Sequence, residues 1–155
     1  MADILIREHR GADKAFLRQM LESAAVPTYP DLQAMGRLSM RDRLDEIFES
    51  HYAQEDKRIW IAETPDERPA GMIWLLPSIH PVTELHDWLV INVAVAPEFQ
   101  RRGIGEKLMH HAKDFCLAHG ARRLRLFVGA RNEAAYRLYE QLGFVDQTRE
   151  MRWDF

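Results

Sequence analysis

A short glycine-containing segment offers the clearest chemistry in the sequence. Gly103 and Gly105 follow Arg101 and Arg102, where an apolar stretch gives way to an amphipathic one. Glycines allow a tight backbone turn and the close approach of a ligand. The first amides of a helix have no partner within the helix, and together with the helix dipole they favour an anion. Because arginine binds phosphate through paired hydrogen bonds, the segment predicts an anion site suited to a phosphorylated ligand.

Two familiar phosphate-binding motifs do not fit this segment. A dinucleotide-binding fingerprint requires a third glycine three residues after Gly105, where the sequence has Leu108. A P-loop requires lysine and then serine or threonine after its last glycine, whereas Glu106 follows here. For these residues taken alone, the alternative is a tight turn that binds nothing.

Other reactive residue types do not form a recognisable set. His110 and His111 are adjacent, so on a helix they face different directions. No group of His, Cys and carboxylates has the spacing of zinc ligands, and we expect no bound metal. Cys116 falls on the apolar stripe of a predicted helix, which indicates a packing role. As it is the single cysteine, no internal disulfide is possible, and a cytoplasmic location is expected.

Hydrophobic periodicity predicts the elements that must position the glycine segment. The expected strands are 4–7, 58–63, 71–76, 88–96 and 124–128, with one or two more within 145–153, and the expected helices are 13–25, 39–51, 103–119 and 132–142. Pro77 and Pro97 are expected to end the strands before them. The helix beginning at Gly103 joins two strands, and such a crossover makes them parallel.

The expected fold is therefore α/β (α+β). It has a mixed, mostly antiparallel sheet of about six or seven strands, with helices on both faces. The 155 residues are 46% hydrophobic and 29% charged, which is ordinary globular composition and predicts a single domain over residues 1–155. No apolar run approaches the ~18 residues that cross a bilayer, and the N-terminal residues are too charged for a secretory signal. We expect no membrane partner.

Charge is distributed unevenly along the chain. Residues 100–137 contain nine Lys/Arg against three Asp/Glu, whereas residues 1–99 contain ten basic and seventeen acidic residues. The first region favours an anion and the second tolerates a cation, although uneven solvated surface is the plainer interpretation. No nucleic-acid partner is expected, because the basic residues are interleaved with buried-looking ones and lack an aromatic platform for bases.

Four motifs together resemble the GCN5-related N-acetyltransferase superfamily. They are Val93-Ala-Val-Ala-Pro-Glu-Phe, Gln100-x-x-Gly-x-Gly, Asn132, and Tyr139-Glu-Gln-Leu-Gly-Phe144, in that family's order and spacing. The resemblance extends from about Leu89 to Phe144. It implies the acyl-CoA N-acyltransferase fold, in which the central parallel strands splay apart, here after Ala96 and before Arg123. It also implies acetyl-CoA as co-substrate.

The resemblance implies how that co-substrate would be held. Backbone groups of the splayed strand would bind the pantetheine arm like an added strand, and amides of the glycine turn would bind the diphosphate. Asn132 would contact the arm, although capping a helix is an equally natural role. The implied cofactor residues are Val93, Ala94, Val95, Gln100, Arg101, Arg102, Gly103, Ile104, Gly105, Asn132 and Tyr139.

Tyr139 matches the family tyrosine that protonates the departing thiolate, and a phenol can donate a proton at neutral pH. The alternative is an ordinary core aromatic on a helix. A direct side-chain base is harder to assign, because the positions that carry Glu or His in some members are Leu89 and Ile91 here. The candidates for the base, acting directly or through water, are Glu84, His86 and Asp87.

The acceptor is expected between the loops 26–38 and 77–87 and the end of the chain. Tyr29, Asp31, Trp88 and Asn92 are the candidate contacts, a mix suited to a small-molecule amine or a protein or peptide N-terminus. The predicted activity is acetyl transfer from acetyl-CoA to a primary amine in a ternary complex. A catalytically weak or inactive acyl-CoA-sensing module, a nucleotide-binding protein unrelated to CoA, and a homodimeric state are left open.

Overall fold

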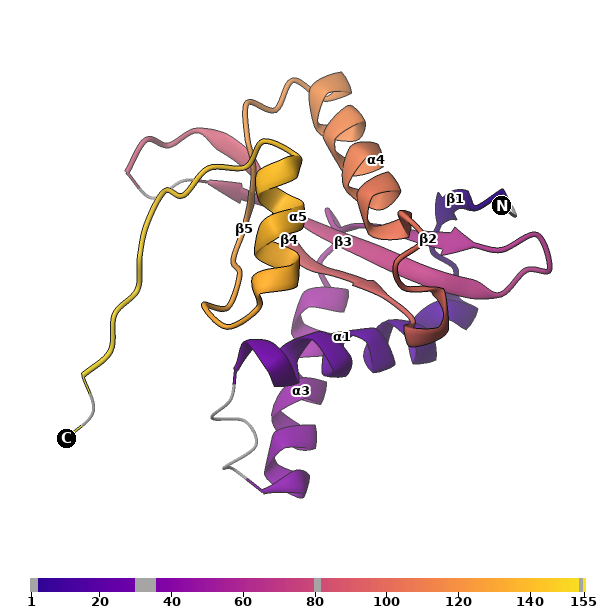
Figure 1. Cartoon of the computed structure of the whole chain (residues 1–155), viewed down its shortest axis with the longest axis horizontal. Helices are drawn as coiled ribbons and strands as arrows, with labels where there is room; N and C mark the ends of the chain where they lie inside the picture. Colours follow the sequence, from indigo (N-terminus) through magenta and orange to yellow (C-terminus); the bar gives the residue numbers. More distant parts are fainter. Residues whose placement is uncertain (1–2, 30–35, 80–81, 154) are drawn as a thin grey trace.

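One mixed sheet runs through the molecule in the computed structural model, which describes the chain except residues 1–2, 30–35, 80–81 and 154. The strand order is β1-β2-β3-β4-β5, and each neighbouring pair is antiparallel except β4 and β5. The strands are β1 (Leu5–Glu8), β2 (Arg58–Glu63), β3 (Pro69–Ile79), β4 (His86–Val95) and β5 (Leu124–Leu126). The helices are α1 (Lys14–Thr28), α3 (Arg37–Tyr52), α4 (Ile104–Ala118) and α5 (Glu133–Gln141), with 3-10 turns η1 (Gly11–Asp13) and η2 (Pro97–Phe99) (Figure 1).

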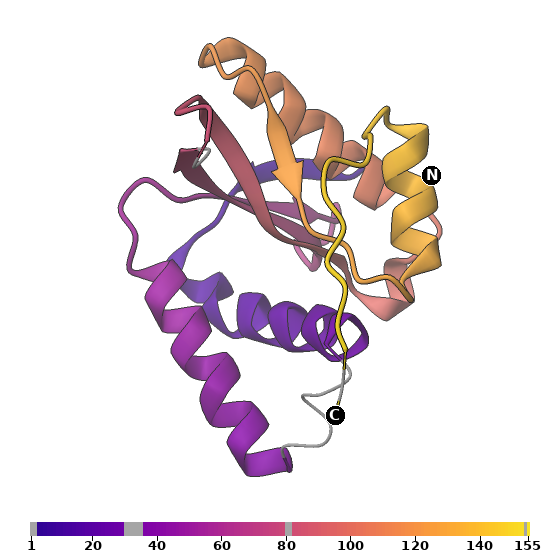
Figure 2. The ribbon, with the colours of Figure 1, turned by 90° about the vertical axis from the view of Figure 1, so that its left-hand side faces the viewer.

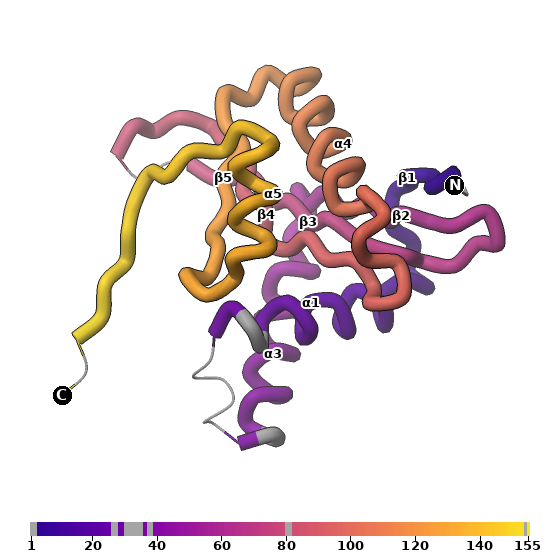
Figure 3. Tube along the Cα trace, viewed as in Figure 1, coloured from indigo at the N-terminus to yellow at the C-terminus, as the bar shows by residue number. Residues whose placement is uncertain are grey.

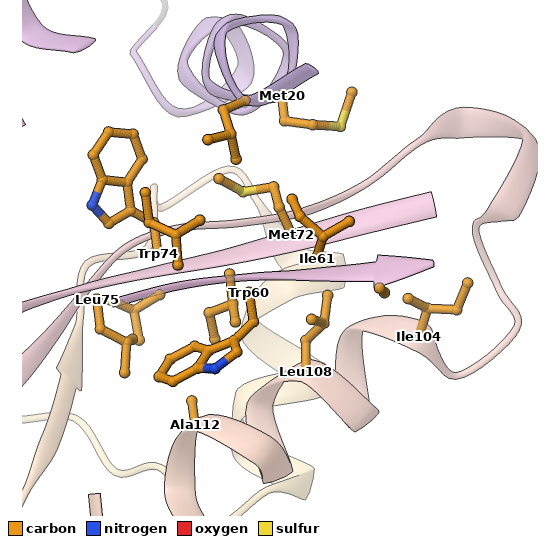
Figure 4. Packing of buried hydrophobic residues seen from close by; sticks show 14 of the residues in the cluster. Met20, Trp60, Ile61, Met72, Trp74, Leu75, Ile104, Leu108 and Ala112 are labelled. Carbon is orange, nitrogen blue, oxygen red and sulfur yellow. The ribbon is translucent and has the colours of Figure 1, made fainter. Parts of the chain in front are cut away.

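Helices cover both faces of the sheet because its inner strands carry apolar residues on both sides. Ile61 of β2 lies on the side of α1 near Met20, whereas the neighbouring Trp60 lies on the side of α4 near Leu108 (Figure 4). All four side chains are buried, and burial of each contributes about 1.5–3 kcal/mol. The expected fold class, a mixed sheet between helices, is confirmed.

The parallel strands β4 and β5 pair over a short distance and then separate. The paired residues are Trp88–Val90 on β4 and Leu124–Leu126 on β5. Beyond them β4 continues to Val95, but β5 has ended. The second half of β4 therefore has a strand on one side, β3, and a gap on the other. This is the predicted splay.

A bulge in β4 lies where the two strands separate. Trp74 of β3 is opposite Asn92, but the next residue, Leu75, is opposite Val90, so Ile91 has no partner on β3. An extra residue in one strand bends it and reverses which residues direct their backbone groups to each neighbour. The bulge thus determines which amides of β4 face the gap.

Two sequence-based predictions about the strands were wrong. Pro77 does not end its strand but lies within β3, opposite Trp88. The amide of Trp88 donates to the carbonyl of Arg123, 3.1 Å away on the β5 side, so Pro77 and Trp88 form a pair that exchanges no hydrogen bonds. Strand β2 no longer accompanies β3 at this position, because its last partner is Leu75. A proline without an N–H is tolerated there.

The second correction concerns strand number: the described residues form five strands, not six or seven. Residues 145–153 are extended but pair with no strand. Their alternating apolar residues are typical of a strand, yet a strand also needs a neighbour for its backbone groups. Figures 1 and 3 show this segment leading away from the sheet.

A buried ion cluster joins β1, η1 and β2. The Arg7 guanidinium donates two hydrogen bonds to Asp13, at 2.8 and 3.0 Å, and a third to Glu63 at 2.6 Å. Burial alone would raise the pKa of Asp13, but hydrogen bonds from Arg7 and from the Arg10 amide outweigh it, so the pKa of this carboxyl lies below its ordinary value. The cluster therefore favours the charged form of Asp13.

Asp13→Asn should lower the free energy of unfolding by about 1.5–3 kcal/mol at neutral pH, because charged hydrogen bonds are lost. Since the folded-state pKa of Asp13 is lowered, its contribution is complete above the unfolded pKa of ~3.9 and is lost as the pH falls through the folded value. Urea titrations of both proteins should converge in strongly acidic solution.

The matched control is Asp66→Asn, which removes an exposed carboxylate that also pairs with an arginine, Arg68, at 2.7 Å. Exposed ion pairs add little, so this variant should match the parent. Equal losses in the two variants would show that the Arg7 cluster has no special stabilising role.

Candidate functional site

The turn before α4 leaves several backbone amides open. Arg101 and Gly103 both have positive φ angles, 59° and 73°. The amide of Lys107 donates to the Gly103 carbonyl at 3.0 Å and closes the first helical turn. Among the described residues, the amides of residues 101–106 have no protein acceptor. Several N–H groups, the helix dipole and two exposed arginine side chains thus meet at one end of α4.

Two aromatic contacts anchor this turn to the body. Phe99 of η2 is buried, and the guanidinium carbons of Arg68 and Arg102 lie 5.2 and 5.5 Å from its ring centre. The side-chain amide of Gln100 donates to the carbonyl of Val95 at 3.1 Å. The turn is therefore fixed to the end of β4 before any ligand binds.

The second half of β4 presents its backbone to the gap. The amide of Ala96 donates to the Ala70 carbonyl on β3, at 2.9 Å. Because backbone groups alternate along a strand, those of Val93 and Val95 face away from β3 and toward the gap. The predicted pantetheine residues thus have the orientation that β-type pairing with an extended ligand requires, although Gln100 already occupies the Val95 carbonyl.

Helix α5 forms a third wall beside the turn. A Cβ built on Gly105 would lie 3.6 Å from Leu138 of α5 and 3.8 Å from Val95 of β4, so α4, α5 and β4 converge there. The side-chain oxygen of Asn132 accepts a hydrogen bond from the amide of Ala135 at 3.2 Å, which confirms the capping role. The elements that carry the implied cofactor residues, namely β4, the start of α4 and α5, therefore meet near Gly105.

Tyr139 lies on α5 and packs partly buried against the core, 5.7 Å from the Phe144 ring. Its hydroxyl hydrogen-bonds to none of the described residues. Burial raises the pKa of this phenol above its ordinary value, so it stays protonated at neutral pH. The group can donate a proton to a ligand.

The predicted bases lie at the start of β4 or just before it, far from the open half of the strand. Glu84 and His86 are exposed, whereas Asp87 is buried and pairs with Arg125 of β5, Oδ2 to Nε, at 3.1 Å. Arg125 also donates to the Ser78 hydroxyl of β3 at 2.7 Å. A strand rises about 3.3 Å per residue, which places Asp87 roughly 13 Å before Ile91, where the gap opens.

The structure separates the predicted acceptor residues. Asn92 is buried opposite Trp74, on the face covered by α1 and α3. Trp88 packs against Phe115 of α4 on the other face, with ring centres 5.1 Å apart. Tyr29 is exposed just after α1. Asp31 lies outside the described residues.

Two tertiary contacts were not anticipated from the sequence. The Asp87–Arg125–Ser78 cluster links three strands, but its members lie far apart in the chain and have no shared motif. A Cβ on Gly129 would lie 3.1 Å from the Thr28 carbonyl, so the loop after β5 runs directly against the end of α1. A lone glycine in a loop gives no signal of such an approach.

In the described part of the chain, no helix is long and apolar enough to cross a bilayer, and no group of His, Cys, Asp and Glu could hold a metal.

Comparison with known proteins shows which protein family this chain resembles. The model of the Acetyltransferase (GNAT) family matches residues 18–144. A [ribosomal protein bS18]-alanine N-acetyltransferase of Salmonella typhimurium is 45% identical over 64 residues, 41% of this chain and 43% of that protein. A spermidine N(1)-acetyltransferase of Vibrio cholerae is 25% identical over 107 residues, 68% of this chain and 60% of that protein. The match thus spans about half of each relative's length.

The fold recurs in solved structures. AAC(6')-Iy, in complex with the bisubstrate analog CoA-S-monomethyl-acetylneamine, superposes with a TM-score of 0.72 at 16% identity, over 99% of each chain. At that identity the likeness shows the fold alone. The family model, by contrast, covers most of the chain, including the turn, the gap and α5. The chain belongs to the Acetyltransferase (GNAT) family.

Proposed function

We propose that this protein transfers the acetyl group of acetyl-CoA to a primary amine. The observation that carries the proposal is the row of open amides at residues 101–106, located beside a gap in the sheet where Val93 and Val95 direct their backbone outward. A diphosphate fits the amides, and an extended amide-containing arm fits the free edge of β4. One ligand with both parts, such as CoA, would occupy both features.

The proposed ligand contacts form two groups, one for the diphosphate and one for the rest of the ligand. Arg101, Arg102, Gly103, Ile104 and Gly105 bind the diphosphate, and the rest of the proposed contact set binds the pantetheine arm and thioester. That set comprises Val93, Ala94, Val95, Gln100, Asn132 and Tyr139. An amide of β4 facing the gap stabilises the carbonyl oxygen as negative charge develops on it.

The reaction needs two proton movements. The amine nitrogen attacks the thioester carbon, the C–S bond breaks, and the thiolate takes a proton. An alkyl amine of pKa ~10.4 costs about 4–5 kcal/mol to deprotonate at pH 7. Tyr139 supplies the proton to sulfur, since its partly buried phenol remains protonated and its hydroxyl hydrogen-bonds to none of the described residues.

The proposed route for the amine proton is through water toward Glu84, just before β4, and His86, its first residue, both of which are exposed. Asp87, although proposed from the sequence as a base, is engaged by Arg125 and is better suited to holding β5 against β4. The distance of all three from the gap favours a second candidate function, an acyl-CoA-sensing module with weak turnover.

The acceptor amine is proposed to enter on the α1 side of the gap, where the loop after β5 meets the end of α1 at Gly129 and Thr28. Of the acceptor contacts predicted from the sequence, Tyr29 would meet the amine from that side, whereas Asn92 is buried and Trp88 packs on the opposite face. The relatives acetylate either a ribosomal protein or spermidine by name. A peptide N-terminus and a small amine are therefore both proposed as acceptor classes.

The direct test is release of free CoA thiol from acetyl-CoA in the presence of an amine panel. The panel should contain peptides with free N-termini, polyamines and aminoglycosides. Release that depends on one amine class supports the transferase. Tight acetyl-CoA binding without amine-dependent release would instead support the sensing module.

Tyr139→Phe should reduce kcat by about 10²–10⁴-fold, the usual contribution of a positioned general acid, with little change in acetyl-CoA affinity. Because burial raises the pKa of Tyr139, the wild-type rate should persist to a higher pH than a free phenol of pKa ~10 would allow. Steady-state kinetics and calorimetric titration measure the two effects.

Tyr136→Phe is the matched control, since Tyr136 lies on the same helix and its hydroxyl donates outward to Asp146 at 3.4 Å. It should retain the parental kcat. An unaltered kcat in Tyr139→Phe, or an equal loss in the two variants, would remove Tyr139 as the acid.

Gly103→Ala should weaken acetyl-CoA binding by tenfold or more, equivalent to about 1.4 kcal/mol. Its new methyl group would project into the open space beside the amides, where no protein atom lies within 4 Å. Calorimetry on the purified variant gives the dissociation constant.

Gly120→Ala provides the comparison at the opposite end of α4. Gly120 has nearly the same φ, 69° against 73°, and equally open surroundings. Both substitutions should therefore cost similar stability, about 1–2 kcal/mol. Equal affinities in the two variants would contradict the proposed diphosphate site.

A further inference from the structure

Two exposed aromatic residues flank the contact between the loop after β5 and the end of α1. A Cβ built on Gly129 would lie 3.1 Å from the carbonyl oxygen of Thr28 and 3.2 Å from its Cα. Phe127 precedes Gly129 by two residues and is 73% exposed. Tyr29 directly follows Thr28 and is 57% exposed. Because two residues of extended chain span only about 7 Å, both rings belong to one small region of the surface.

Phe127 lies where the gap opens, on the side of α1. The parallel ladder between β4 and β5 ends one residue before it. Trp88 packs on α4, so the preceding Asp87 and its partner Arg125 lie on the other face of the sheet. Side chains alternate along an extended chain, which places Phe127, two residues after Arg125, on that same face. Figure 2 shows α1 and α3 below the sheet and α4 above it.

The charge of this region disfavours a second positive charge on the acceptor. Residues 121–131 contain four arginines and no acidic residue, and residues 23–29 at the end of α1 contain no acidic residue either. Arg131, two residues after Gly129, is exposed. The nearby carboxylate of Asp87 is buried and already pairs with Arg125 at 3.1 Å. A polyamine would therefore bring like charges together here, without a counter-charge from these segments.

We infer that the acceptor carries an apolar group beside its amine, and that Phe127 and Tyr29 hold this group at the mouth of the gap. A peptide whose first residue is apolar has such a group, and it would bury area against two aromatic rings. A polyamine gains little from the rings and meets Arg131. Phe127 thereby determines the acceptor class. This inference rests on the proposed acetyl transfer and narrows its acceptor.

The test compares two tripeptides that differ in their first residue, leucine or arginine, each followed by two glycines, and it includes spermidine. With acetyl-CoA, the parent should favour the leucine tripeptide in kcat/KM by about tenfold or more, the effect of an aromatic anchor. Phe127→Ala should lose this preference. Phe127→Glu should reverse it, because the new carboxylate attracts the arginine side chain and spermidine. A parent that prefers spermidine or the arginine tripeptide, or an unchanged preference in Phe127→Glu, would overturn the inference.

Leu117→Ala is the matched control, since Leu117 is an apolar residue that is 63% exposed on α4, on the other side of the sheet. It should retain the parental preference. Calorimetric titration of both tripeptides into the CoA-saturated protein needs no turnover, so it separates the acceptor class from the proposed reaction. Tighter binding of the leucine tripeptide, lost in Phe127→Ala, supports the inference even without acetyl transfer. Equal transfer to all three amines, unaffected by Phe127→Ala, would sustain the acetyltransferase but contradict this acceptor class.

Discussion

The site depends on one extra residue in β4. Ile91 has no partner on β3. After this residue, the backbone N–H and C=O groups of the odd-numbered residues of β4 face the side on which β5 lies earlier in the strand, and not β3. Before the bulge, Trp88 pairs with Leu124 in a regular parallel ladder. After it, β5 has ended and the groups of Val93 and Val95 face a gap. A regular β4 would instead direct these groups into β3 and leave nothing for an extended ligand.

The bulge can shape a ligand site because β5 and the glycine turn are both held in place beside β4. The Arg125–Asp87 pair and the Ser78 hydrogen bond hold β5 against β4 at the closed end. At the open end, Gln100 ties the glycine turn to Val95. The open amides of the turn and a free strand edge are thereby held in a fixed relation, which suits a long ligand with charge at one end and a reactive group at the other.

Part of this arrangement could be predicted from local sequence. The segment around Gly103 combines a positive-φ glycine, a helix start and arginines, and these act within a few residues, so the turn was recognisable. The capping role of Asn132 is local in the same way. By contrast, the effect of Pro77 depends on the strand opposite to it, and residues 145–153 pair with no strand of the described sheet, which no local pattern can reveal.

The sequence by itself therefore determined the helices and strands up to α5, the glycine turn before α4 and the family resemblance, since each arises from short-range backbone chemistry or motif spacing. Tertiary structure decided where the parallel strands separate. It also buried Asp87 in an ion pair with Arg125. It also divided Trp88 and Asn92 between opposite faces of the sheet. Those outcomes depend on register and on contacts between residues distant in the chain, and a shift of one residue in a strand moves its side chains to the other face.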